Sequence, residues 1–302
     1  MKSFYSHGKL LISGEYLVLD GARALAIPTR FGQWLHVREN SDNLLKWRSL
    51  DENEKPWYSG AFIRQNGEWI GQDEDHITMR LRQILNIANI LNPDFLREEI
   101  GYDVVSMLEF SRDWGLGSSS TLLNNIAQWA NVDAFELSEL TFGGSGYDIA
   151  CAMYSHPILY NKANGSRQID SIDFSPDFQS NLYFLHLNKK QDSRQAIASY
   201  RESELVTESL IRTISKLSED MAACTTLVRF QKLMEQHEEI ISDILGIKPV
   251  SQRLFPDFEG SIKSLGAWGG DFVLVASEED PRDYFRKKAY QTLVPFGEMI
   301  LK

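Results

Sequence analysis

The segment Gly115-Leu116-Gly117-Ser118-Ser119-Ser120 combines two glycines with three hydroxyl residues, directly ahead of an apolar helical pattern. Glycine allows a tight turn and a close approach of the backbone to a ligand, and serine is a common helix N-cap. The free N–H groups and the positive end of a helix dipole attract anions such as a nucleotide phosphate. The segment therefore predicts a phosphate-binding loop, although a serine-capped glycine turn also begins many helices that bind no ligand.

Two better-known phosphate loops do not fit this segment. A Walker A loop ends in Gly-Lys-Ser/Thr, and residues 115–120 contain no lysine. The dinucleotide fingerprint needs a third glycine where Ser120 stands, and an acidic residue about 20 positions later at the end of a second strand. Asp133 comes too early for that role, which argues against an oxidoreductase.

Asp148 and Lys9 are the other residues whose types and surroundings could do chemistry. Asp148 follows the flexible turn at residues 143–146 and opens a further apolar helical pattern, so its carboxylate either faces a ligand or caps a helix. Lys9 opens an apolar strand pattern, where it is either catalytic or a solvated edge residue. The six histidines show no metal-ligand spacing, and Cys151 and Cys224 are too few for a thiolate metal site or a disulfide framework.

The order of these segments along the chain resembles the GHMP small-molecule kinases. Residues 6–16 (Ser-His-Gly-Lys-Leu-Leu-Ile-Ser-Gly-Glu-Tyr) resemble their first motif, and residues 115–120 match their phosphate loop. Residues 144–150 (Gly-Ser-Gly-Tyr-Asp-Ile-Ala) look like the segment that presents their catalytic aspartate, and residues 263–271 (Lys-Ser-Leu-Gly-Ala-Trp-Gly-Gly-Asp) are similar to their third, glycine-rich motif. The likeness is closest to the phosphomevalonate kinases, with the mevalonate kinases next.

This resemblance implies a two-domain α+β fold, with an N-terminal domain like the second domain of ribosomal protein S5 and a ferredoxin-like C-terminal domain. It implies an ATP-dependent, Mg²⁺-using kinase that phosphorylates phosphomevalonate or mevalonate in isoprenoid precursor synthesis. A diphosphomevalonate decarboxylase-type enzyme and a catalytically silent nucleotide-binding relative are the alternatives. Trp268 stands where the family usually has glycine, which leaves open how closely that loop approaches a phosphate or the acceptor.

The resemblance also assigns roles to individual residues. Lys9 would neutralise charge on the transferring phosphoryl group, and Asp148 would take a proton from an alcohol acceptor or position a phosphate acceptor. The backbone of Gly115 to Ser120 would hold the ATP phosphates, and Ser119 would ligate Mg²⁺ together with Glu139 or Glu136. The expected substrate-binding residues are Glu15, Tyr16, Ser145, Gly146, Tyr147, Lys189, Lys190, Arg194, Gly266 and Ala267.

Hydrophobic patterns predict the elements that must position these residues. Apolar or alternating runs predict strands at residues 9–12, 16–19, 24–27, 33–37, 44–47, 57–63, 102–110, 156–160, 182–187 and 272–276. Periodic apolar residues predict helices at 77–91, 122–130, 205–217 and 227–245, the first of them stopped by Pro93. The simplest division is an α+β domain at 1–165 and a second at 166–302.

Composition excludes several classes of protein. The 302 residues include 31 Lys plus Arg and 42 Asp plus Glu, a net charge of −11, which argues against a nucleic-acid binder. An anionic acceptor would then need local cations, for which Lys189, Lys190, Arg194 and Arg112 are candidates. No apolar run is long enough to span a membrane or to serve as a signal sequence. We expect a cytoplasmic monomer or homodimer whose partners are ATP and a small-molecule acceptor.

Overall fold

The computed structural model describes residues 1–65, 67–73, 75–96, 100–189, 193–203, 205–266, 268 and 270–301. Contacts between Cα atoms divide the chain into two units that are discontinuous in sequence. Unit 1 comprises Met1–Gly8, Phe31–Arg112 and Leu116–Met153, and unit 2 comprises Lys9–Arg30, Asp113–Gly115 and Tyr154–Lys302. Strands β1 (Lys2–Ser13) and β2 (Ala24–Asn40) contribute residues to both units. The contiguous division at residue 165, expected from the sequence, stays a prediction.

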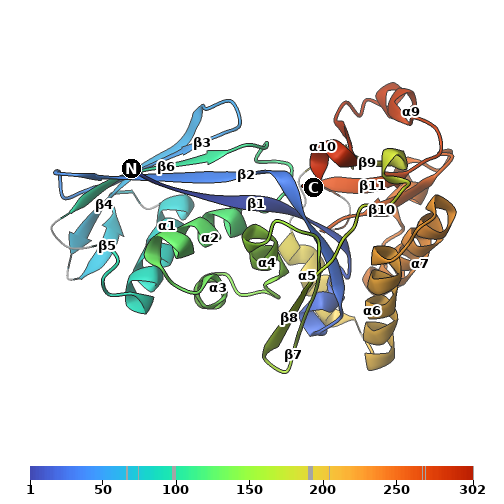
Figure 1. Ribbon diagram of the computed structural model, residues 1–302, viewed down its shortest axis with the longest axis horizontal. Helices are drawn as coiled ribbons and strands as arrows, with labels where there is room; N and C mark the ends of the chain where they lie inside the picture. Colours follow the sequence, from blue (N-terminus) through green and yellow to red (C-terminus); the bar gives the residue numbers. More distant parts are fainter. Residues whose placement is uncertain are drawn as a thin grey trace. The chain divides into compact units, whose positions relative to one another are not determined.

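Unit 1 is an α/β layer built on one mixed sheet. Within this unit the sheet has the order β5-β4-β3-β6-β2; β3 is parallel to β6 and the other pairs are antiparallel. Figure 1 shows helices α1, α2 and α3 on one face of this sheet. The elements are β3 (Leu45–Leu50), β4 (Pro56–Gln65), β5 (Glu68–Gly71), α1 (His76–Leu91), β6 (Gly101–Leu108), α2 (Ser118–Ala130), α3 (Ala134–Thr141) and α4 (Tyr147–Met153).

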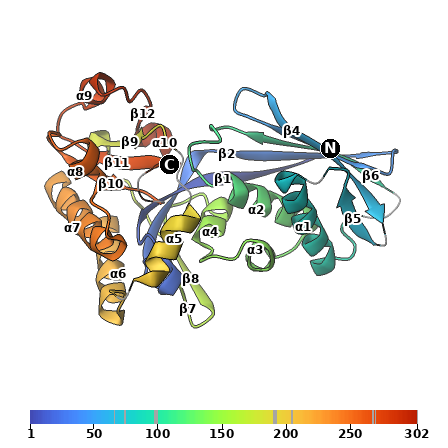
Figure 2. The ribbon, with the colours of Figure 1, turned by 180° about the vertical axis from the view of Figure 1, so that it is seen from behind.

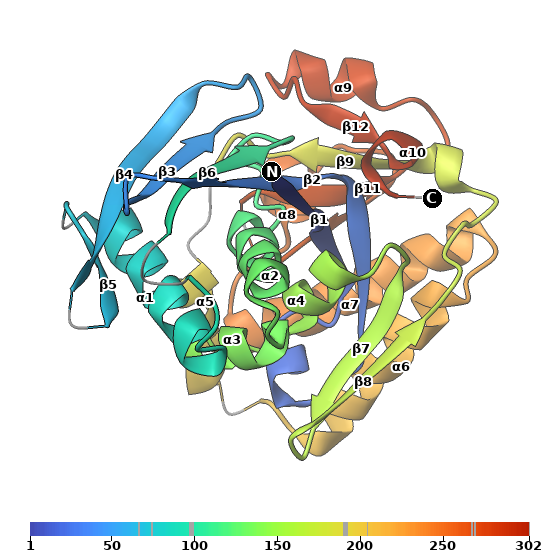
Figure 3. The same ribbon diagram turned by 60° about the vertical axis from the view of Figure 1, so that its left-hand side comes forward.

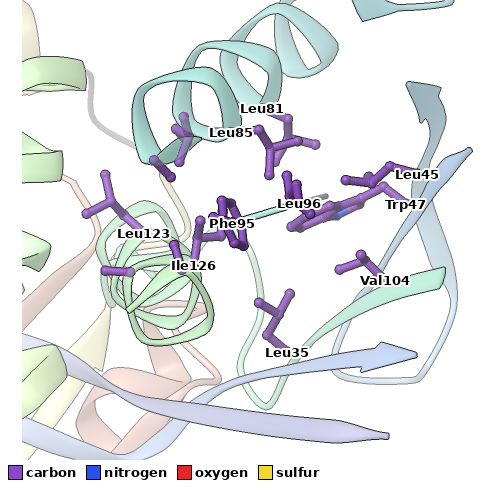
Figure 4. Packing of buried hydrophobic residues seen from close by; sticks show 14 of the residues in the cluster. Leu35, Leu45, Trp47, Leu81, Leu85, Phe95, Leu96, Val104, Leu123 and Ile126 are labelled. Atoms are coloured by element: carbon purple, nitrogen blue, oxygen red, sulfur yellow. The ribbon is translucent and has the colours of Figure 1, made fainter. Parts of the chain in front are cut away.

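The core of unit 1 follows from the two periodicities of its elements. Alternate residues of β3, such as Leu45 and Trp47, are buried, while the residues between them are exposed. Leu81, Leu85 and Ile84 of α1 lie on one face of that helix, as the spacing predicts. Figure 4 shows the side chains of Trp47, Leu85 and Ile126 gathered in one cluster, with Phe95 and Leu96 between those of β3 and those of α2. The packed sheet therefore fixes α2, the helix that follows the expected phosphate loop.

Unit 2 contains an antiparallel sheet of order β10-β11-β9-β12. Helix α7 packs against β10 and lies along one side of the sheet in Figure 2. Val273 and Val275 of β11 share a hydrophobic cluster with Val250 of α8 and Phe285 of α9. The elements are η1 (Leu17–Asp20), β7 (Ile158–Ala163), β8 (Ser166–Ser171), η2 (Gln179–Asn181), β9 (Leu182–His186), α5 (Ser193–Glu202), α6 (Glu208–Ala222), α7 (Leu227–Leu245), α8 (Val250–Leu254), β10 (Ser261–Ser264), β11 (Phe272–Ala276), α9 (Arg282–Lys287), β12 (Leu293–Pro295) and α10 (Phe296–Met299).

A hairpin formed by β7 and β8 completes unit 2. The hairpin lies beside α6 in Figure 3. Arg23 contributes to this arrangement, because its guanidinium binds Asp170 of β8 and, at 2.8 Å, Glu219 of α6. One guanidinium with several donors can bind two carboxylates at once, which joins the hairpin to the helix.

Most of the expected elements are present, and one expectation is wrong. The helices predicted at 77–91 and 227–245 and the strand at 272–276 are confirmed within a residue or two. Residues 16–19, expected as a strand, instead enter the 3₁₀ helix η1. Gly14 and Tyr16 have φ values of 92° and 62°, in the left-handed region, so the backbone turns there and cannot stay extended.

Candidate active site

The N-terminus of α2 carries the predicted phosphate loop. Gly117 is its N-cap residue, with a left-handed φ of 88°, and in the described part of the chain no side chain caps the helix. The expected serine cap is therefore wrong: Ser120 Oγ instead donates to the carbonyl of Gly117 at 2.8 Å. Since the first N–H groups of a helix have no intrahelical partner, the amides of Ser118 and Ser119 are available to an anion.

A buried polar network anchors α2 inside unit 1. Ser6 Oγ donates to Asn125 Oδ1 at 2.7 Å, and Asn125 Nδ2 donates to the carbonyl of Gln33 at 2.8 Å. Thr121, which directly follows the loop, donates from Oγ1 to Gln33 Oε1 at 2.6 Å. Buried polar groups that are fully hydrogen-bonded fix a helix in register and rotation. Sequence reasoning missed this network, because the polar residues in 121–125 give no local sign of their partners.

Asp148 lies in the first turn of α4, which packs against α2 within unit 1. Gly144 and Gly146 have φ values of 97° and 91°, so the turn before the helix needs glycine at both positions. Asp148 and Tyr147 are half-buried, whereas Ser145 and Gly146 are buried. Asn124 Nδ2 donates to the carbonyl of Ala152 at 3.3 Å and ties the two helices together. The phosphate-loop helix and the helix that carries Asp148 are therefore neighbours.

The expected Mg²⁺ ligands also lie on neighbouring helices of unit 1. Ser119 is exposed in the first turn of α2, while Glu136 and Glu139 are exposed on α3, which packs against α2. Among the described residues no three His, Cys, Asp or Glu side chains form a metal cluster. Mg²⁺ in nucleotide sites takes one or two protein oxygens, with phosphates and waters completing its octahedron. An accessible hydroxyl and an accessible carboxylate fit that donor set.

Unit 2 brings Lys9, Gly115 and Asp271 together. Lys9 Nζ donates to the carbonyl of Gly115 at 3.2 Å. Gly115 has a φ of 66°, and a Cβ placed on it would lie 2.5 Å from Asp271 Oδ2. The N–H of Asp271 donates to the carbonyl of Lys189 at 2.7 Å, which brings the backbone of Lys189 to the same place. Asp271 was not among the predicted site residues, although it is the acidic residue that closes the third motif.

Residues 113 and 114, which precede the loop, are held by side chains of the β9–β11 strands. Nε2 of the buried His186 donates to the carbonyl of Asp113 at 3.0 Å. The ring of Trp114 meets the ring of Phe272 edge to face, with centroids 5.4 Å apart. Such aromatic pairs contribute about 0.5–1.5 kcal/mol beyond their buried area. Asp113 and Trp114, just before the phosphate loop, are therefore held by contacts within unit 2.

Glu15 is bound internally by side chains of unit 2. Its exposed fraction is 1%, and its carboxylate accepts a 2.6 Å hydrogen bond from Lys263 Nζ and lies 3.1 Å from Nε2 of His237. Burial alone raises the pKa of a carboxyl group, but the adjacent ammonium of Lys263 outweighs burial and lowers the pKa of Glu15 to about 2. Its expected contact with substrate stays a prediction.

Tyr16 and Trp268 are in direct contact within unit 2. The backbone N–H of Trp268 donates to the hydroxyl of Tyr16 at 3.0 Å. The Trp268 side chain is 2% exposed, so its bulk packs inside the unit. Its amide is therefore engaged by Tyr16 in this structure. Gly266, two residues earlier, is half-buried with a φ of 63°.

The expected substrate cations are only partly described. The side chain of Lys189 is exposed. Lys190 and Ala267 lie outside the described residues, as does the side chain of Arg194. In unit 1 the guanidinium of Arg112 lies over the ring of Trp57, 3.8 Å from its centroid. An arginine stacked in this way keeps its charge and its in-plane donors.

Comparison with known proteins identifies the fold. No protein-family model matches the sequence, and no curated protein matches it. Solved structures do match: the mevalonate kinase of Methanococcus jannaschii has a TM-score of 0.69 and 15% identity over 97% of this chain and 96% of that one. The Streptococcus pneumoniae phosphomevalonate kinase in complex with phosphomevalonate and AMPPNP gives 0.70 and 13% over 95% of each chain. The Lactococcus lactis galactokinase complexed with galactose gives 0.64 and 12% over 95% and 88%.

These structures share the two-domain α+β fold of the GHMP kinases, so the chain has that fold and the expected fold class is confirmed. The matches cover nearly the whole of each chain, so the similarity extends over the complete fold. Within the described part of the chain, no helix is both long enough and apolar enough to cross a bilayer.

Proposed function

We propose that this protein is an ATP-dependent small-molecule kinase of the GHMP type, with phosphomevalonate or mevalonate as its acceptor. The observation that carries the proposal is the N-terminus of α2, which has no side-chain cap among the described residues, so that its first-turn amides are open to a ligand. Backbone N–H groups in that position, at the positive end of a helix, suit the phosphates of a nucleotide. The fold supports the same reaction class, since kinases of several small molecules share it.

Phosphoryl transfer asks for positioning and for neutralisation of charge more than for covalent chemistry by the protein. In the proposal, the amides of Ser118, Ser119 and Ser120 hold the phosphates of ATP. Lys9, whose ammonium is hydrogen-bonded to the Gly115 carbonyl, supplies a cation at the start of the same loop. Bound Mg²⁺, with Ser119 and Glu139 or Glu136 as its protein ligands, would neutralise further charge on the phosphates.

Asp148 has a role that depends on the acceptor. An alcohol such as that of mevalonate must lose a proton, and a positioned base contributes about 10²–10⁴-fold to the rate. A phosphate monoester has a second pKa of about 6 and is already ionised at neutral pH, so Asp148 would then position it. The phosphate acceptor would need a cation at the acceptor side, for which the exposed Lys189 is a candidate.

A panel assay tests the reaction class and the acceptor together. ADP release is followed with Mg-ATP and, in turn, mevalonate, 5-phosphomevalonate, galactose and homoserine, with each product identified by mass. Turnover of 5-phosphomevalonate or mevalonate supports the proposal. Turnover of galactose or homoserine alone keeps the kinase class and replaces the acceptor.

Two further readouts separate the alternative functions. Carbon dioxide release from diphosphomevalonate would identify a decarboxylase. ATP binding without turnover of any compound would indicate a nucleotide-binding relative, and the absence of ATP binding would overturn the assignment of residues 115–120.

A further inference from the structure

Four ionisable side chains meet in the interior of unit 2: Glu15, His237, Glu238 and Lys263. Each is at most 3% exposed. Lys263 Nζ donates to Glu15 Oε1 at 2.6 Å and to the carbonyl of Ser264 at 2.9 Å. Glu238 accepts hydrogen bonds from the N–H and the hydroxyl of Ser264, at 3.0 and 3.2 Å. The cluster thus joins the turn after β1, helix α7 and the end of β10.

Lys263 is the partner on which the Glu15 carboxylate depends. His237 Nε2 accepts a 3.0 Å hydrogen bond from the N–H of Gly14, so this nitrogen cannot also donate to Glu15. Burial and the neighbouring Lys263 lower the pKa of His237, which favours the neutral ring. Glu238 is itself a carboxyl group and brings no positive charge. Among the described residues, the ammonium of Lys263 is therefore the cation that compensates Glu15.

The ion pair holds a strained turn in place. Gly14 and Tyr16, on either side of Glu15, both have a left-handed φ. For a tyrosine this conformation costs of the order of 1–3 kcal/mol and persists only where neighbouring contacts fix it. Here three contacts do so: Gly14 N–H binds His237, the Glu15 carboxylate binds Lys263, and the Tyr16 hydroxyl accepts from the Trp268 amide.

The same ion pair lies at the base of the turn that carries Asp271. Strands β10 and β11 pair with Ser264 opposite Val273, and residues 265–271 connect them. Lys263 binds Glu15 and Trp268 binds Tyr16, so the third motif is held to the first motif at these two residues. At its end, the Asp271 carboxylate lies against Gly115. A shift at the base would therefore move Asp271 relative to Gly115.

We propose that the buried Glu15–Lys263 pair is a positioning element that holds Trp268 and Asp271 in place relative to Gly115 for turnover. This inference rests on the proposed kinase function. Replacing a buried ion pair by uncharged residues is often neutral or stabilising, so stability alone gives no reason for one here. The Glu15–Lys263 ion pair is directional and fixes the first motif relative to the third, which explains why charged residues are present here.

The test uses the double variant Glu15→Gln/Lys263→Met, because either single change leaves a buried charge without its partner. Hydrogen exchange of peptides covering 14–17 and 265–273 is measured by mass spectrometry, together with kcat and KM on the acceptor that the wild type turns over. Lys288→Met is the matched control, since it removes a lysine paired with Asp257 on the surface of the same unit. ATP affinity is measured for each variant.

We expect both peptides to exchange faster in the double variant, while α7 stays protected and ATP affinity is unchanged. We expect kcat to fall roughly 10- to 100-fold, because a misplacement of about 1 Å in a catalytic site costs this much. Lys288→Met should match the wild type in every readout. Unchanged exchange in both peptides, or faster exchange with wild-type kcat, would overturn the inference. A wild type that turns over no acceptor would instead overturn the proposed function, and the exchange data would still decide whether the pair fixes the turn.

Discussion

The carboxylate of Asp271 occupies the space that a side chain on Gly115 would need. A Cβ on Gly115 would come within 2.5 Å of Asp271 Oδ2 and 2.6 Å of its Cγ, distances that real Cβ atoms do not tolerate. Residue 115 begins the phosphate loop and residue 271 ends the third glycine-rich motif, so this close approach couples two motifs that are far apart in sequence. The requirement for glycine is therefore double, since the φ of 66° is also unfavourable for other residues.

Gly115→Ala should consequently lose more than backbone strain. A left-handed alanine costs roughly 1–2 kcal/mol, and here the displacement of Asp271 adds to this cost. Gly165→Ala, at the β7–β8 turn, is the matched control: Gly165 has a φ of 77°, and a Cβ on it would meet nothing within 4 Å. Gly115→Ala should lower the free energy of unfolding in urea and the affinity for ATP more than Gly165→Ala does. Equal losses in both variants would contradict the role of Asp271.

Asp148→Asn should abolish most turnover and leave ATP binding intact. The amide keeps the shape of the side chain but can neither accept the proton of an alcohol nor carry the negative charge. We expect kcat to fall by about 10²–10⁴-fold if the acceptor is an alcohol, and by less if it is a phosphate. Asp243→Asn, an exposed change on α7, is the control. Undiminished kcat in Asp148→Asn would remove this residue from the mechanism.

Local patterns in the sequence predicted the elements, and contacts over long sequence distances explain what they missed. The helix at 77–91 and the strand at 272–276 follow from periodicity that a short window contains. The strand expected at 16–19 is absent because four apolar residues fit a 3₁₀ turn equally well. A tyrosine also gives no indication in the sequence that its backbone is left-handed, as it is at Tyr16. No pattern could pair Glu15 with Lys263, which is 248 residues away. The same holds for the proximity of Asp271 to Gly115.

Asn125→Ala should destabilise unit 1 through the phosphate-loop helix. The change leaves the hydroxyl of Ser6 without its acceptor and the carbonyl of Gln33 without the donor Nδ2. A buried polar group that loses its partner costs about 1–3 kcal/mol, and Asn125 is fully buried. Urea unfolding measures the loss, with the exposed Asn53→Ala as control. A free energy of unfolding equal to that of the control would show that the network does not anchor α2.

Glu238→Gln should change how stability depends on pH. Burial, opposed by Lys263, raises the pKa of Glu238 from 4.5 to about 8. Between these two values the folded protein binds a proton that the unfolded chain releases, so the free energy of unfolding falls as pH rises, by about 1.4 kcal/mol per unit. Glu15 acts in the opposite sense and over another pH range. Its lowered pKa of about 2 means that the ionised carboxylate stabilises the folded protein at pH values above the ordinary carboxyl pKa of 4.5, and this stabilisation is lost as pH falls toward 2.

The free energies of unfolding of the wild type and Glu238→Gln are compared from pH 5.5 to pH 8.5. Groups outside the buried cluster titrate alike in both proteins, so the difference reports the cluster that contains this carboxyl group. Glutamine cannot ionise, so the variant should gain stability relative to the wild type as pH rises across this range. Glu239→Gln, an exposed change on the next residue of the same helix, should follow the wild type. A difference that stays constant with pH would mean that Glu238 is already ionised in the folded protein, and that Lys263 compensates two carboxylates instead of one.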